Sequence, residues 1–268
     1  MSLRLGFGLG LPCRGQAASA WTPASLFTAS EVGGWFDPSD LSTVWQDSAR
    51  TTPGAVDQPV GALDDKSGNG NHLVQATADA RPILRQSGAL YYLERDGADD
   101  FLASAATLTL GAGWTLAAAG SFTAGSNTST ASMLALEVSS SNYFMLGMRQ
   151  SIESARSAIR GADADPAVSL TTSDGGSNSY PDAVAAVLVS RFAALSHDIR
   201  SNGTTLDTEA TAWDAQALAD ANLAFGRESV APVVAANLYA AVAVDRVVNA
   251  AELTRLESWL ASKSGVTL

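Results

Sequence analysis

The sequence predicts an all-β fold, an antiparallel sandwich with one amphipathic helix at its C-terminus and an extended arm at its N-terminus. Most of the chain between residues 83 and 245 consists of short apolar or alternating segments, separated by clusters of Gly, Asn, Asp and Ser. Helical periodicity is clear only after residue 249. A single helix that follows many strands is typical of a sandwich in which the helix covers one sheet.

Composition limits the class of protein. The chain has 268 residues, enough for one large sandwich domain, and 46% of them are hydrophobic. It carries 16 Lys and Arg against 27 Asp and Glu, so its net charge is −11. Phosphate backbones and anionic lipids repel such a chain, and we expect neither nucleic acid nor membrane as a partner. The single cysteine, Cys13, excludes an internal disulfide framework.

We expect residues 1–30 to form an arm for attachment or oligomerisation, and residues 31–268 to form the domain. Pro12 and Pro23 disfavour helix and strand in the arm. Its basic start and short apolar run resemble a signal peptide, but three glycines interrupt that run, and we favour the arm. No apolar run reaches the roughly 18 residues of a membrane span.

Two motifs precede the strands. In the first, Ser39 or Asp40 is expected to cap a short helical turn that carries Leu41, Val44 and Trp45. The second is residues 64–72, here called the gateway loop, with the sequence Asp64-Asp65-Lys66-Ser67-Gly68-Asn69-Gly70-Asn71-His72. Its glycines and asparagines accept a positive φ at low cost, so the pattern predicts a tight loop that leads into the strands.

The strands are expected in chain order. An Asp-Gly turn over residues 96–100 follows the first of them, and residues 163–180 read as an exposed loop. In residues 195–200, Leu195, His197 and Ile199 alternate with polar residues and should face the core. The expected strands are Ile83–Arg85, Leu90–Arg95, Trp114–Phe122, Ser132–Val138, Tyr143–Arg149, Ala155–Arg160, Ala183–Phe192, Leu195–Arg200, Asn222–Gly226 and Asn237–Asp245.

The C-terminal helix has the clearest signals. Asn249 and Glu252 have the spacing of a capping box, and Leu253 begins an apolar stripe at helical spacing. Lys263 suits the last turn and Gly265 suits the C-terminal cap.

Several of these motifs together resemble a known family. They are Trp35-Phe36-Asp37-Pro38-Ser39-Asp40-Leu41-Ser42, the gateway loop, Arg81-Pro82, residues 92–102, and Val242-Ala243-Val244-Asp245-Arg246 before the helix. In this order they resemble laminin-G-like, concanavalin A-like jelly rolls of phage and gene transfer agent virions, over residues 31–268. The resemblance implies a head-spike or tail-fibre component that binds a host surface polysaccharide, often as a trimer. It also implies that the arm contacts other virion proteins, and that the protein is located on the particle surface.

Sugar binding calls for a planar aromatic ring beside polar side chains. Three aromatic residues lie in or next to segments that read as loops, and each could instead anchor its loop or contact another subunit. The candidate residues for carbohydrate binding are Tyr143 with Asn142, Tyr180, and Trp213 with Asp214.

Calcium is the only cofactor for which the sequence offers candidates. Asp96, Asp99 and Asp100 form an oxygen cluster that is also compatible with a plain Asp-Gly turn. The gateway loop partly matches a calcium loop from Asp65 onward, but its twelfth position is Ala76 and lacks the bidentate carboxylate. A hydrogen-bonded turn is the simpler interpretation there.

The sequence offers no catalytic pattern, and we expect no enzyme. The Glu-x-Asp-x-x-Glu pattern of retaining glycosidases on this fold is absent: Glu137 stands alone, and Glu94 and Asp96 alternate only at a turn. There is no Gly-x-Ser-x-Gly elbow, and His72 and His197 lack further ligands for zinc. Two alternatives remain open, a purely structural virion protein without a ligand and a polysaccharide-degrading glycosidase.

Overall fold

The computed structural model describes residues 21–109, 111, 113–122, 130–139, 142–149, 154–160, 168–171, 184–193, 196–210, 220–226 and 235–268. Their strands form two sheets, and every strand pair is antiparallel. The predicted antiparallel sandwich is therefore confirmed.

The first sheet, called sheet A, has eight strands in the order β15-β14-β13-β8-β17-β6-β5, with β1 also paired to β17. Its strands are β1 (Gly33–Phe36), β5 (Ile83–Ser87), β6 (Leu90–Arg95), β8 (Gly113–Phe122), β13 (Ala186–Ala193), β14 (Ser196–Ser201), β15 (Thr204–Glu209) and β17 (Ala236–Val244).

The second sheet, called sheet B, has nine strands in the order β12-β11-β10-β9-β16-β7-β4-β3-β2. Its strands are β2 (Val44–Trp45), β3 (Ala62–Leu63), β4 (Leu73–Val74), β7 (Leu102–Leu108), β9 (Thr130–Ser139), β10 (Asn142–Arg149), β11 (Ser154–Arg160), β12 (Val168–Thr171) and β16 (Ala221–Phe225). Three short 3-10 helices, η1 (Pro23–Leu26), η2 (Leu41–Thr43) and η3 (Ala78–Ala80), and the helix α1 (Ala250–Ser264) complete the described elements.

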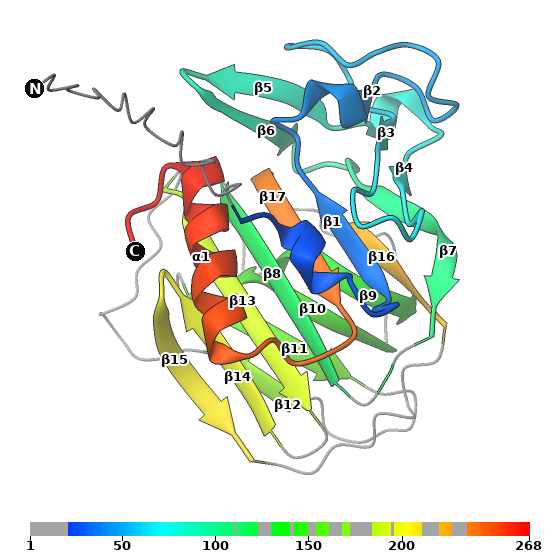
Figure 1. The fold of residues 1–268 in the computed structure, drawn as a ribbon. Coiled ribbons are helices and arrows are strands. Elements are labelled where there is room, and N and C mark those ends of the chain that lie inside the picture. The colour runs from blue at the N-terminus through cyan, green and yellow to red at the C-terminus, as the bar shows by residue number, and fades with distance from the viewer. Residues whose placement is uncertain are drawn as a thin grey trace, which may run out of the picture.

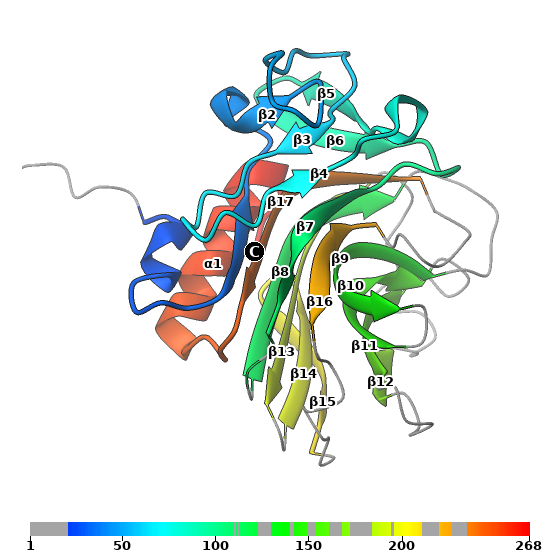
Figure 2. The ribbon, with the colours of Figure 1, turned by 90° about the vertical axis from the view of Figure 1, so that its right-hand side faces the viewer.

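The molecule has three layers. Helix α1 lies on the outer face of sheet A (Figure 1), and sheet B covers the opposite face, as the edge-on view in Figure 2 shows. The main core, which includes Leu116, Phe144 and Phe225, fills the space between the sheets. A second core, which includes Val242, Leu256 and Leu260, joins sheet A to the helix.

Strand β8 shows how sequence produces this layering. It lies between β13 and β17, and its residues from Trp114 to Phe122 are buried. Leu116 and Ala118 belong to the core between the sheets, whereas Ala117 and Ala119 belong to the core under the helix. Side chains alternate between the two faces of a strand, so Ala117 and Ala119 face the helix. Their small side chains let the helix approach the sheet closely.

Helix α1 begins and ends as predicted. The Asn249 side chain accepts hydrogen bonds from the backbone N–H groups of Ala251 and Glu252, and the Glu252 side chain completes the capping box. Gly265 closes the helix in the left-handed conformation, with φ of 74°. The structure describes no helix that is both long and apolar enough to cross a membrane.

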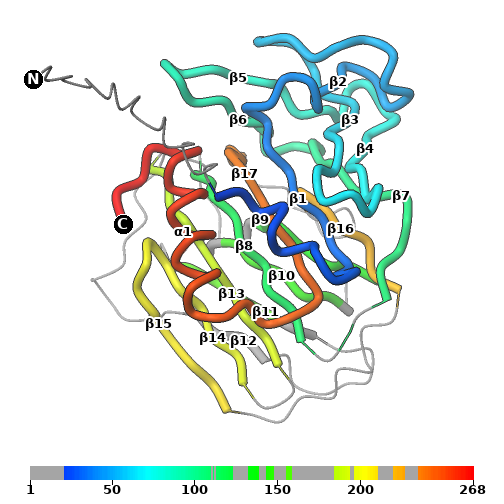
Figure 3. The backbone as a smooth tube through the Cα atoms, in the orientation of Figure 1, coloured from blue at the N-terminus to red at the C-terminus, as the bar shows by residue number. Residues whose placement is uncertain are grey.

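The gateway loop holds the first strand in place. β1 runs along sheet A and leads into the short strands β2 to β4, which lie at one end of the sandwich (Figure 3). The Asn69 and Asn71 side chains both donate to the carbonyl oxygen of Gly33, and the Lys66 N–H donates to the carbonyl oxygen of Trp35. The loop is thereby bonded to β1, and β1 in turn pairs with β17.

Three local differences from the sequence predictions appear. Residues 168–171, inside the segment expected to be a loop, form β12. Asp40 does cap a short turn, η2, but Val44 and Trp45 beyond it form β2. In the predicted arm, residues 1–20 lie outside the described residues, whereas Leu26 is fully buried in the core under the helix.

Candidate functional site

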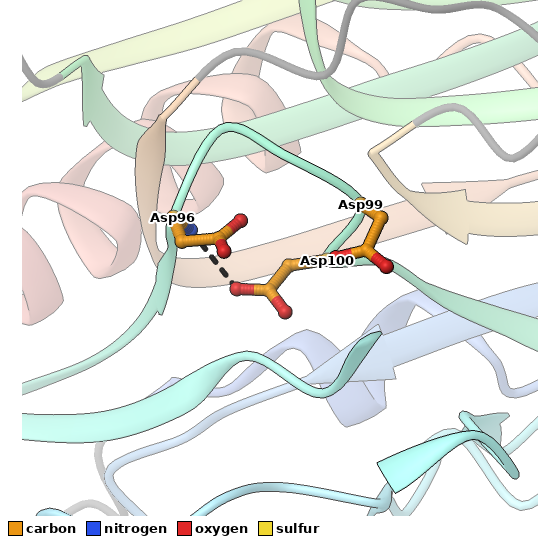
Figure 4. A group of neighbouring side chains, drawn as sticks. All are labelled: Asp96, Asp99 and Asp100. Atoms are coloured by element: carbon orange, nitrogen blue, oxygen red, sulfur yellow. Dashed lines mark hydrogen bonds between the residues drawn. The ribbon is translucent and has the colours of Figure 1, made fainter. Parts of the chain in front are cut away.

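Three aspartates gather where the chain crosses from sheet A to sheet B. Asp96, Asp99 and Asp100 lie between β6 and β7, and their carboxylate oxygens are within 4.8 Å of one another (Figure 4). Asp100 accepts a hydrogen bond from the Asp96 N–H at 2.9 Å, and Asp96 accepts one from the Ala98 N–H at 2.7 Å. Gly97 at the tip has φ of 84°, so the predicted Asp-Gly turn is confirmed.

A buried arginine lies directly before this turn. Arg95 is 2% exposed, donates from Nη2 to the Ser132 carbonyl oxygen at 3.0 Å, and stacks on Phe225 with 4.8 Å to the ring centroid. Burial lowers its pKa to about 10, although Asp100 and Asp96 attract the charge. Gly226 leaves space for it, because a Cβ there would lie 2.4 Å from Nη1 of Arg95.

The pKa of Asp100 is raised, whereas that of Arg95 is lowered. Burial raises the pKa of its carboxyl group to about 6, and the negative charges of Asp96 and Asp99 add to the effect. The hydrogen bond from the Asp96 N–H and the charge of Arg95 partly offset this. Crowded carboxylates are a ligand type that calcium accepts, but two of the three already bind backbone N–H groups of the turn. Calcium at Asp96, Asp99 and Asp100 stays a prediction from the sequence.

The carboxylate of Asp65, the other calcium candidate, is occupied by the protein. It accepts hydrogen bonds from the N–H groups of Trp35, Ser67 and Asn71 and from the Ser67 hydroxyl, at 2.8 to 3.0 Å. Its neighbour Asp64 accepts hydrogen bonds from the side chains of Trp45 and Arg50. The gateway loop is therefore a hydrogen-bonded structural loop around Asp65, in agreement with the simpler interpretation of its sequence.

Tyr143 begins the strand predicted at 143–149, and the structure places it in a strand. It is the second residue of β10 and is only 7% exposed, in a cluster with Ala135, Met145 and Ala158. β9 continues to Ser139 and β10 begins at Asn142, so each strand is one residue longer at this connection than the strands expected at 132–138 and 143–149. Tyr143 is consequently part of the sheet.

Strand register places Glu137 beside this tyrosine. Glu137 is opposite Tyr143 on one side and opposite Asn222 on the other, so the three share one face of sheet B. Neither direct neighbour is a second carboxylate, whereas a glycosidase uses two. Glu94 already forms an ion pair, since its carboxylate is 2.6 Å from Nε of Arg85.

The remaining sugar-binding candidates are not placed. Tyr180, Trp213 and Asp214 lie outside the described residues, and only the backbone of Asn142 is described.

A buried polar cluster connects the two sheets and was missed from the sequence. His197 of β14 and Ser190 of β13 meet Ser157 of β11, with 2.7 Å from His197 Nε2 to the Ser157 hydroxyl and 3.1 Å to that of Ser190. All three are at most 3% exposed, so this serine–histidine pair is closed to a substrate. Burial lowers the pKa of His197 to about 4, and its Nδ1 has no hydrogen-bond partner within the described part of the chain. The only sequence signal was the inward position of His197.

No protein-family model matches the chain, and no curated protein matches it by sequence. Solved structures share its fold. Domain 4 of the extracellular arabinanase AbnA from Geobacillus stearothermophilus, solved with arabinotriose, has a TM-score of 0.57 and 11% identity, with 72% of this chain and 92% of that domain covered. Botulinum neurotoxin type C, whose cell entry depends on two ganglioside molecules, has a TM-score of 0.58 and 10% identity over 88% of this chain. Trypanosoma rangeli sialidase has a TM-score of 0.56 and 15% identity over 88% of this chain.

These likenesses confirm the predicted concanavalin A-like jelly-roll sandwich. The chain spans 52% of the neurotoxin chain and 33% of the sialidase chain, so each match is to a part of a larger protein. At such identities the likeness is one of fold.

Proposed function

We propose that this protein is a surface component of a phage or gene transfer agent particle that binds a host-cell polysaccharide without cleaving it. The observation that carries the glycan part is the likeness to the arabinanase domain, which was solved with arabinotriose bound and is covered over 92% of its length. The virion part rests on the family resemblance of the motifs around Trp35, the gateway loop and Asp245.

Binding without cleavage is supported by the carboxylates described above. Glycosidases need a pair of acidic groups about 5 to 9 Å apart that flank the bond to be cleaved. Glu137 has Tyr143 and Asn222 as its direct cross-strand neighbours, Glu94 pairs with Arg85, and the aspartates of the 96–100 turn bind backbone N–H groups. In the proposal these groups have structural roles, and the protein is a lectin-like module.

Particle attachment is assigned to residues before the domain. Residues 1–20 precede Pro23, the first buried residue in the described part of the chain, and an arm there would leave both described sheets intact. A homo-oligomer, such as the trimer of the resembled family, would present several weak glycan sites together and so gain avidity.

The proposal is tested by binding purified protein to host cells that carry their surface polysaccharide and to cells stripped of it. Binding that requires the polysaccharide is the expected result. Equal binding to both cells, or none to either, would contradict the proposal and favour a structural virion protein without a ligand.

A further inference from the structure

Two tyrosines meet on the helix side of sheet A, near the C-terminal end of the helix. Tyr92 lies in β6 and Tyr239 in β17, and both pack in the core that joins sheet A to α1. Leu90, two residues before Tyr92, lies close to the helix cap, because a Cβ at Gly265 would be 3.2 Å from its Cδ1. Figure 1 shows β5 and β6 beyond this end of α1, so the sheet continues past the helix there.

The two rings form a fixed pair. Their centroids are 5.2 Å apart, and their planes are inclined at 46°. Tyr239 is 9% exposed, whereas Tyr92 is partly exposed, so Tyr92 is the ring that a ligand can reach. An aromatic side chain that already packs against another ring loses little conformational freedom when a ligand stacks on it.

Charged side chains lie on the same face as the exposed ring. Arg85 is the direct cross-strand partner of Tyr92, and Glu94 lies two residues farther along β6. Arg85 donates from Nη1 to Asp57 at 2.8 Å and from Nε to Glu94 at 2.6 Å. The hydrogen bonds to Asp57 and Glu94 raise the pKa of Arg85, so they preserve its charge and hold its guanidinium in one orientation.

These side chains retain bonding capacity toward a ligand. Those of Arg85 and Glu94 are 37% and 35% exposed. Nη2 of Arg85 makes no hydrogen bond within the described part of the chain. Glu94 uses Oε2 for its structural ion pair, and its Oε1 is left as an acceptor. A donor and an acceptor therefore lie close together beside the Tyr92 ring.

This combination fits a sugar ring. Pyranose and furanose rings have C–H groups on their faces, which stack on an aromatic ring, and hydroxyls around their edges, which donate and accept. Two carboxylates, Asp57 and Glu94, against one guanidinium leave the group net negative, which disfavours phosphate and sulfate. We infer that Tyr92, Arg85 and Glu94 form a subsite in which one sugar unit of the target glycan stacks on Tyr92. The inference rests on the proposed glycan-binding function.

The test measures binding of the full chain to arabinotriose and to purified host polysaccharide by isothermal titration calorimetry. Tyr92→Ala removes the ring, and Tyr92→Phe keeps it. Arg85→Gln removes the guanidinium at a partly exposed position, so it decides the matter if Tyr92→Ala fails to fold. Tyr91→Ala is the matched control, because Tyr91 is also partly exposed but pairs with Gln86 and points to the other face of the sheet. Thermal unfolding verifies that each variant is folded.

Tyr92→Ala and Arg85→Gln are each expected to bind about tenfold or more weakly, whereas Tyr92→Phe and Tyr91→Ala should change the affinity less than about twofold. If the wild type binds a probe and the folded Tyr92→Ala and Arg85→Gln proteins bind it equally well, glycan binding stands and the subsite is wrong. An equal loss in Tyr91→Ala would also overturn the subsite. If the wild type binds neither probe, the proposed function fails and the inference fails with it.

Discussion

Lys263 in the last turn of α1 lies 2.8 Å from the carboxylate of Asp37, just after β1. Asp37 is 3% exposed, and a second lysine, Lys66 of the gateway loop, approaches the same oxygen at 3.7 Å. Each lysine lies over a tryptophan, Lys66 over Trp35 and Lys263 over Trp259, and the two rings meet edge to face at 5.9 Å. Three segments that are distant in sequence are thus joined at one carboxylate.

Replacing this carboxylate should destabilise the domain. We expect Asp37→Asn to lower the free energy of unfolding by about 2 kcal/mol, between the values for exposed and fully buried ion pairs. Asp40→Asn is the matched control, because Asp40 pairs with the same Lys66 but its side chain is 37% exposed. It should cost at most about 1 kcal/mol. Urea denaturation measures the free energy of unfolding of both variants. Equal losses in the two variants would show that the buried Asp37 carboxylate stabilises the domain no more than the exposed Asp40 carboxylate.

The stability of the domain should fall at acidic pH because of His197. Its pKa in the folded state, about 4, is below the ordinary value of 6.5, so the unfolded chain binds the proton first as pH falls. The stability that neutral His197 contributes is fully present above about pH 6.5 and is lost toward pH 4. This loss amounts to at most about 3 kcal/mol of the free energy of unfolding.

The variant His197→Gln removes this titration. Its free energy of unfolding, measured by urea denaturation at several pH values, should vary less between pH 4 and 6.5 than that of the wild type. His72→Gln, at a partly exposed histidine, serves as the control. Parallel curves for wild type and His197→Gln would contradict the assignment.

Ionisation of Asp100 should lower the stability of the domain as pH rises, which is opposite to the effect of His197. Its folded-state pKa, about 6, is above the ordinary 3.8, so the folded protein retains the proton and this stabilisation is lost as pH rises from 3.8 through 6. Asp100→Asn keeps an acceptor for the Asp96 N–H but cannot ionise. We expect it to raise stability by about 1 to 2 kcal/mol near pH 7.5. Calorimetric melting at pH 5 and 7.5 measures the difference, and a variant less stable at both values would refute it.

Truncation distinguishes the arm from the domain. Deletion of residues 1–20 should leave the melting temperature within about 2 °C of the full chain, whereas deletion of residues 1–27 also removes the fully buried Leu26 and should lower stability by about 2 to 4 kcal/mol. Deletion of residues 1–20 should impair assembly into the particle and leave folding intact. Unfolding of that shorter deletion would show that residues 1–20 belong to the domain.

Local signals in the sequence predicted the fold well. The capping box of Asn249, the glycine cap at 265 and the inward position of His197 all depend on nearby residues, and the structure has each of them. Predictions failed where the answer depends on pairing partners distant in sequence. Residues 168–171 were expected to lie in a loop, yet pairing with β11 makes them the strand β12.

The candidate site was less accessible to sequence reasoning for the same reason. The aspartates at 96, 99 and 100 are close in sequence and were found, but their neighbour Arg95 shows no sign in the sequence of its complete burial. Arg191, Asp198 and Thr208 come from three different strands, and only the sheet register brings them side by side.

The most direct measurement incubates purified protein with host surface polysaccharide and records bound protein and released reducing ends in the same tubes. The account predicts saturable binding with no reducing ends above a protein-free control. Release of reducing ends that is abolished by one carboxylate substitution, such as Glu137→Gln, would contradict the account and make the protein a glycosidase.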